Sequence, residues 1–155
     1  MAGSSTANPF FFDLADPQAY LEAERLRAAD PAVEWVPVIA PPAYRCAEEV
    51  ASMREDVERR AAAMGLQEVR WPKRFPFDSA RAMLVATYAK QIGRAVAFSL
   101  AAFRQAYAAG RPLDVDENIL IAAAACEMHP RAVLKAMETR GVQSALDAAT
   151  AAAAR

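Results

Sequence analysis

Short apolar runs flank one helical pattern in the first forty residues. Residues 10–14 form an aromatic run that predicts a buried strand, and residues 33–39 alternate enough to predict a second strand. Between the two runs, Asp16 and Pro17 mark a helix start, because aspartate caps free backbone amides and proline suits the first helical position. The order strand, helix, strand predicts two neighbouring parallel strands with a right-handed crossover.

The rest of the chain shows only helical patterns. The expected helices cover, in order, residues 45–64, 79–91, 94–109, 116–128, 130–139 and 142–154. The last of them is rich in alanine, with Val142 and Leu146 as its main apolar anchors. The predicted fold class is therefore α/β and dominated by helices. Two parallel strands are too few for a stable sheet, so we expect either that later strands are missing or that a second copy completes the sheet in a homodimer.

Composition and charge argue against several classes of protein. The 155 residues suit one domain, and the net charge of -1 argues against a general nucleic-acid or anionic-membrane binder. Because the start of the chain shows no export signal and no apolar run is long enough to cross a bilayer, we expect a cytoplasmic protein. Cys46 and Cys126 lie far apart with no CxxC or metal-ligand spacing, so we expect two buried thiols and no metal site.

Four stretches of the sequence together resemble a known family over residues 10–150. They are "FFFDLADPQAYLEAERL", "EWVPVI", "RWPKRFPFDSARAM" and "GRAVAFSLAAFRQAYAAGRPLDVDENI". The chain resembles the DsbA-like thioredoxin superfamily and, within it, is most similar to 2-hydroxychromene-2-carboxylate isomerases, relatives of the kappa-class glutathione transferases.

The resemblance implies a fold and a division of the chain. Residues 9–44 would be the N-terminal half of a thioredoxin-like domain, and residues 45–140 an all-helical insertion domain. Residues 141–155 would begin the return helix. Because the family continues with a cis-proline loop, two more strands and a helix, we expect the chain to be truncated and to lack the C-terminal part of the thioredoxin fold.

The family resemblance also points to the junction between the first strand and helix. It implies a serine there in the isomerases, which holds the glutathione thiol, and a cysteine in the oxidoreductases. Here the position is Asp16, followed by Pro17. A carboxylate would occupy the helix amides and repel a thiolate, so Asp16 is interpreted either as a helix cap or as a general base. With no sulfur at this junction, disulfide exchange there is excluded.

Further candidates come from the loop before residue 80. The resemblance implies that Asp78 matches an asparagine that contacts glutathione or substrate, and Ser79, Pro17 and Lys73 complete the cofactor-binding candidates. Candidates for an aromatic substrate pocket are Phe12, Trp71, Phe75 and Phe77. The alternatives stay open: Asp78 as a helix cap, the aromatic side chains as a core seam, and Lys73 as a solvated charge.

Two functions remain at this point. The first is a glutathione-dependent 2-hydroxychromene-2-carboxylate isomerase-like protein, with glutathione as cofactor and a small aromatic carboxylate from aromatic-compound degradation as its partner. The second is a degenerate DsbA-family protein without thiol chemistry, which serves as a binding module.

Overall fold

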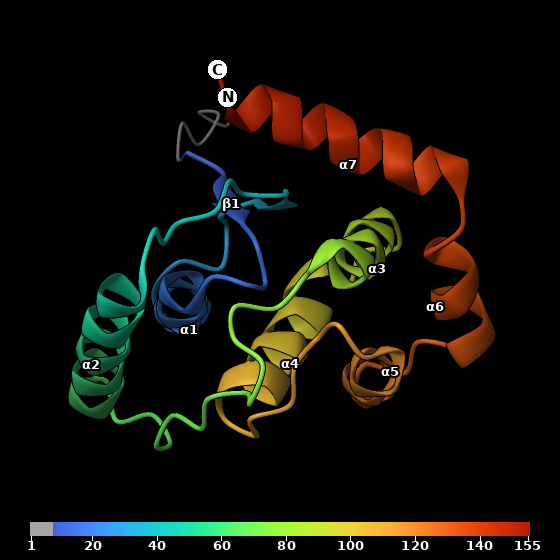
Figure 1. Cartoon of the computed structure of the whole chain (residues 1–155). Coiled ribbons are helices and arrows are strands. Elements are labelled where there is room, and N and C mark those ends of the chain that lie inside the picture. The colour runs from blue at the N-terminus through green and yellow to red at the C-terminus, as the bar shows by residue number, and fades with distance from the viewer. Residues whose placement is uncertain (1–7) are drawn as a thin grey trace, which may run out of the picture.

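The computed structural model describes residues 8–155, and within this range helices dominate (Figure 1). The first unit is strand β1 (Phe10–Phe12), helix α1 (Pro17–Ala29) and strand β2 (Trp35–Pro37). The remaining elements are α2 (Ala47–Ala63), α3 (Ala80–Gln91), α4 (Ala95–Tyr107), α5 (Asp116–Ala125), α6 (Pro130–Ala136) and α7 (Arg140–Ala153). The predicted order of one strand–helix–strand unit followed by helices is confirmed.

The two strands are parallel neighbours, with Phe10 opposite Trp35 and Phe12 opposite Pro37. Both are shorter than the apolar runs predicted. After the second strand, the backbone amide of Ile39 donates to Thr150 Oγ1 at 3.0 Å, and that of Ala40 donates to Asp13 Oδ2 at 2.9 Å. The Ala40 amide lies on the side of its segment that faces β1, as the Val38 amide does, so its bond to Asp13 ends the pairing of the two strands. The Ile39 amide faces the opposite edge.

An aromatic cluster joins the strand–helix–strand unit to the helices that follow. The Phe12 ring lies 5.8 Å from Trp35 and 5.9 Å from Phe103 on α4, measured between ring centroids. Tyr20 on α1 lies 5.7 Å from Tyr107 on α4, whose hydroxyl donates to the Leu14 carbonyl at 2.9 Å. One continuous core therefore runs through the described residues, and it places the end of β1 against α4.

Glycines end two helices where the sequence predicts breaks. Gly65 after α2 has a φ of +73°, and Gly93 between α3 and α4 has a φ of +75°, both in the left-handed region that glycine adopts without steric cost. Helices α5 and α6 each stop about a turn before their predicted ends. After α5 the chain turns through Glu127, which has a φ of 59°.

Helix α7 runs across α3 and β2 (Figure 1). Its only buried side chains are Val142 and Leu146, the two predicted anchors. The hydrogen bond from the Ile39 amide to Thr150 fixes α7 at the end of β2. Through this contact the last helix supports the segment that follows β2, which forms one wall of the site described next.

Candidate functional site

A cavity of about 410 Å³ lies at the carboxyl ends of both strands. Three segments line it: parts of residues 13–16 after β1, residues 39–44 after β2, and residues 76–79 before α3. Ligands of parallel-sheet proteins commonly bind outside the carboxyl ends of the strands. The position of this cavity at that edge of the sheet makes it the candidate functional site.

Asp13 holds the three lining segments together. Its side chain is buried, with 6% of the residue exposed. Oδ1 accepts hydrogen bonds from the Ala15 amide at 2.9 Å and the Ser79 hydroxyl at 2.6 Å, and Oδ2 accepts one from the Ala40 amide at 2.9 Å. Asp13 is not among the site residues predicted from the sequence. The available signal was an acidic residue directly after a buried aromatic strand.

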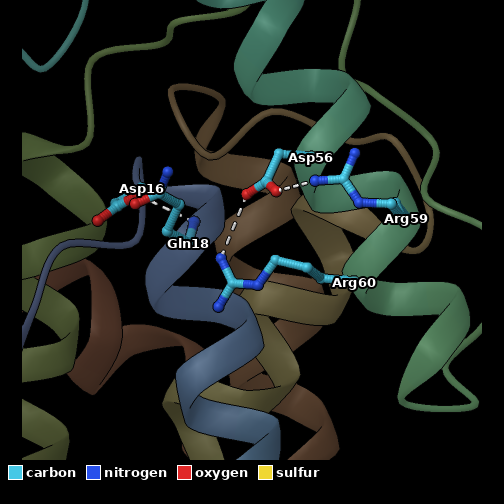
Figure 2. A network of polar contacts seen from close by, with 5 residues as sticks. All are labelled: Asp16, Gln18, Asp56, Arg59 and Arg60. Atoms are coloured by element: carbon cyan, nitrogen blue, oxygen red, sulfur yellow. Dashed lines mark hydrogen bonds and ion pairs between the residues drawn. The ribbon is translucent and has the colours of Figure 1, made fainter.

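Asp16 caps helix α1 and lines the cavity. Its Oδ1 accepts a hydrogen bond from the Gln18 amide at 2.9 Å, which confirms the predicted cap (Figure 2). Burial raises the pKa of the Asp16 carboxyl, and the charge of Asp13 adds to this effect, while hydrogen bonds from the Gln18 and Ala19 amides oppose it. Asp16 therefore takes up a proton more readily than an exposed aspartate does.

Tyr44 forms part of the wall contributed by the segment after β2. Burial, together with the negative charge of Asp16, raises the pKa of its phenol to about 12. The phenol is therefore neutral at ordinary pH and can donate or accept a hydrogen bond. Tyr44 also lines a second cavity of about 510 Å³ between α1 and α2, which includes Gln18, Asp56 and Arg59.

Figure 2 shows the polar side chains on α2 beside Gln18. Asp56 pairs with Arg59 at 2.5 Å and with Arg60 at 3.5 Å. One carboxylate, that of Asp56, therefore pairs with both guanidinium groups, and all three side chains are substantially exposed. Asp56 and Arg59 line the second cavity, and neither they nor Arg60 line the Asp16 cavity.

The start of α3 supplies the third wall. Asp78 Oδ1 accepts a hydrogen bond at 2.9 Å from the amide of Ala80, the first residue of α3, while the N-cap position is Ser79, whose buried hydroxyl donates to Asp13. Phe77 lines the cavity beside Pro76. Of the predicted site residues, Asp16, Asp78, Ser79 and Phe77 thus meet at one cavity.

The other predicted aromatic residues lie elsewhere. Phe12 belongs to the core, between Trp35 and Phe103. Trp71 donates from Nε1 to Glu58 on α2 at 2.7 Å, and the Arg54 guanidinium lies 5.3 Å from the Trp71 ring and 5.6 Å from the Phe75 ring. Phe12, Trp71 and Phe75 therefore do not line the Asp16 cavity, because core packing and contacts with α2 hold them.

The remaining cofactor-binding candidates also lie outside the lining. Pro17 is buried as the first residue of α1, directly after Asp16. Lys73 is exposed in the loop before α3. Its neighbour Arg74 pairs with Asp114 through two hydrogen bonds, at 3.0 and 2.9 Å. Neither basic side chain of this loop lines the cavity.

The prediction that both cysteines are buried is wrong. Cys46, at the start of α2, is exposed rather than buried, and Cys126, after α5, is half-buried. Burial raises the pKa of the Cys126 thiol, and Arg94 opposes this effect. Neither cysteine lines the cavity. Within residues 8–155, no group of three or more His, Cys, Asp or Glu side chains has the arrangement of a metal site.

Comparison with known proteins agrees with the fold. A model of the DsbA-like thioredoxin domain family matches residues 9–155. The chain belongs to this family. A structure of 2-hydroxychromene-2-carboxylate isomerase is similar with a TM-score of 0.79 and 19% sequence identity, over 94% of this chain and 77% of the isomerase.

A second structure of the DsbA-like family is also similar. A probable DsbA oxidoreductase from Streptomyces coelicolor has a TM-score of 0.71 and 21% identity, over 94% of this chain and 74% of the oxidoreductase. No curated protein gives a significant match. Among the described helices, none is long and apolar enough to span a membrane. The predicted family and its helix-dominated α/β fold are confirmed.

Proposed function

We propose that this DsbA-like protein binds a small organic molecule in the Asp16 cavity and carries out no thiol chemistry there. The observation that supports this proposal is the Asp16 side chain, which occupies the Gln18 amide at the tip of α1. A reactive thiolate is stabilised by free amides at a helix N-terminus. In this chain a carboxylate already satisfies the first of those donors.

The surrounding charges support the same conclusion. Asp13 and Asp78 line the cavity together with Asp16, so a thiolate there would face three carboxylates. Like charges raise the pKa of a thiol and disfavour its ionised form. The cavity is nevertheless large enough for a ligand, since small-molecule sites commonly enclose about 300–1,000 Å³.

Titration calorimetry with glutathione tests this proposal. We expect no heat of binding at millimolar glutathione. Micromolar binding that weakens in Asp78→Ala would contradict the proposal and support a glutathione site. The matched control is Asp114→Ala, which removes a carboxylate that lies outside the lining and pairs with Arg74.

Glutathione-dependent isomerisation of a small aromatic carboxylate is the second candidate function. Two observations favour it: the similarity in fold to 2-hydroxychromene-2-carboxylate isomerase, and a cavity carboxyl, Asp16, whose pKa is raised toward the range useful for proton transfer. Under this candidate, Asp16→Asn abolishes the glutathione-dependent conversion of 2-hydroxychromene-2-carboxylate, followed by absorbance. No conversion by the unchanged protein would exclude that substrate.

A further inference from the structure

The lining of the Asp16 cavity is unbalanced in charge. It contains three carboxylates, those of Asp13, Asp16 and Asp78, and neither lysine nor arginine. Arg74 pairs with Asp114 and Arg81 on α3 pairs with Asp116, while Lys73 is exposed in the loop before α3 and does not line the cavity. A ligand that carries a carboxylate or phosphate therefore meets like charge and no cationic partner at this site.

The hydrogen-bonding capacity of the lining is also unbalanced. Both oxygens of Asp13 are engaged, by three donors in all. Asp16 Oδ1 accepts from the Gln18 amide, and the Ala19 amide also bonds to this carboxylate, while Asp78 Oδ1 accepts from the Ala80 amide. Because an ionised carboxylate offers about four acceptor positions, Asp16 and Asp78 each keep acceptor capacity. The Ser79 hydroxyl donates to Asp13. The cavity thus offers spare acceptors on two of its walls, and the ligand has to supply the donors.

The remaining walls are apolar. Ile39, Pro41, Pro42 and Phe77 line the cavity, and the Tyr44 ring adds an aromatic surface with a neutral hydroxyl. An alkyl or aromatic group would be desolvated against these side chains. An ammonium group would form charge-assisted hydrogen bonds with the Asp16 and Asp78 carboxylates, and an aromatic face beside it attracts a cation.

From the cavity, its carboxylates without a basic partner in the lining and its apolar walls, we propose that the ligand is a protonated amine on a small apolar body. The inference rests on the proposed function, because it names the ligand class of the same cavity. It gives Asp16 and Asp78 a shared role as the ammonium acceptors, one at the tip of α1 and the other at the tip of α3.

A matched series of probes tests the ligand class. Phenethylamine, phenethyl alcohol and phenylacetate share an aromatic body and differ mainly in the charge of the polar end. In calorimetry at neutral pH, we expect the amine to bind about tenfold or more tightly than the alcohol, since a charge-assisted hydrogen bond contributes at least the free energy of a tenfold change. We expect the carboxylate to bind most weakly.

Variants test the two acceptors. Asp16→Asn and Asp78→Asn keep a side-chain oxygen that accepts from the same backbone amide but remove the charge, so each should weaken phenethylamine binding about tenfold and leave binding of the alcohol nearly unchanged. The control is Asp30→Asn at the opposite end of α1, about 20 Å from Asp16 by helix rise, where binding should not change. Thermal unfolding of each variant verifies that it is folded.

The outcomes separate this inference from the proposed function. Equal or tighter binding of the alcohol or the carboxylate would overturn the amine class and still support a small-molecule cavity. If phenethylamine binds and neither substitution in the cavity changes its affinity, the amine class is likewise overturned and a small-molecule cavity is still supported. Failure of all three probes to bind at millimolar concentration would contradict both the inference and the proposed function.

Discussion

At the scale of single residues, Asp13 contributes more to the architecture of the site than any residue selected from the sequence. It accepts one hydrogen bond from each of three positions, namely Ala15, Ala40 and Ser79, which lie on the three lining segments. All three partners donate. A carboxylate, which accepts at both oxygens, suits this position, whereas an amide would place a donor group against another donor.

Replacement of Asp13 by asparagine should therefore destabilise the fold. We expect Asp13→Asn to lower the free energy of unfolding by about 2 kcal/mol, because at least one buried donor loses its acceptor. Urea denaturation followed by circular dichroism measures the change. The control substitution Asp30→Asn, in a solvent-accessible cap at the end of α1, should change stability much less. Equal stability of the two variants would contradict the role of Asp13.

The raised pKa of Asp16 predicts how the stability of the fold changes with pH. Burial raises its folded-state pKa above the ordinary 3.8, so the folded state binds the proton more tightly than the unfolded state does. This contribution to stability is present below the unfolded pKa and is lost as the pH rises through the folded pKa. Asp16→Asn, which keeps the cap, should therefore gain stability relative to the unchanged protein as the pH rises from about 4 to about 7.

Paired urea denaturations of the two proteins across that pH range give the measurement. A stability difference that does not change with pH would show that the folded and unfolded pKa values of Asp16 are equal. Asp147→Asn, on the exposed face of α7, is the control for the general effect of removing one carboxylate.

At the scale of elements, α7 depends on two side chains. Leu146 is 1% exposed and Val142 is 4% exposed, whereas the other side chains of this alanine-rich helix are exposed or only partly buried. Alanine favours the helical state but buries little apolar area. A small apolar contact therefore holds α7 in place, and through α7 it supports the wall near Ile39.

Truncation of the larger anchor should release this helix. We expect Leu146→Ala to cost about 3 kcal/mol through lost burial and the cavity that remains. Hydrogen exchange should accelerate in α7 and in residues 39–40 while α4 stays protected. Leu134→Ala on α6 is the matched control, since Leu134 is 41% exposed and its loss removes little buried area. Similar effects of the two substitutions would contradict the anchoring role.

At the scale of the whole molecule, the sheet has an edge that no described strand covers. β1 pairs with β2 alone. Phe10 and Phe12 direct their backbone groups toward β2, so alternation along the strand turns those of Phe11 to the opposite edge. The Phe11 side chain is 42% exposed. Unpaired strand edges are sites for association with another chain.

The expected homodimer follows from this edge and stays a prediction. Sedimentation should show a monomer–dimer equilibrium, and Phe11→Lys should shift it toward the monomer, because a charged side chain on an edge strand opposes pairing. Ile121→Lys is the control, a similarly exposed apolar residue on α5 that is 41% exposed. A monomer at every concentration, or equal effects of both substitutions, would contradict the prediction.

Much of the local structure followed from the sequence alone. Apolar spacing, the Asp16–Pro17 start and the breaks at Gly65 and Gly93 predicted the parallel strand pair and the order of the helices. Helical periodicity and capping are properties of neighbouring residues, so they can be read without the fold. The motifs that resemble the DsbA-like family predicted its membership for the same reason, because they are contiguous.

The tertiary structure alone decided which residues meet at the site. Asp13 and Tyr44 line the cavity, whereas Phe12 packs in the core and Trp71 and Phe75 contact α2. Residues in an aromatic run look alike in sequence, and their direction depends on what packs against them. The surroundings of β2 likewise depend on distant residues, since Asp13 accepts from the Ala40 amide, and Thr150 accepts from the Ile39 amide across more than a hundred residues. Contacts between distant segments have no local signal, and the candidate site consists of such contacts.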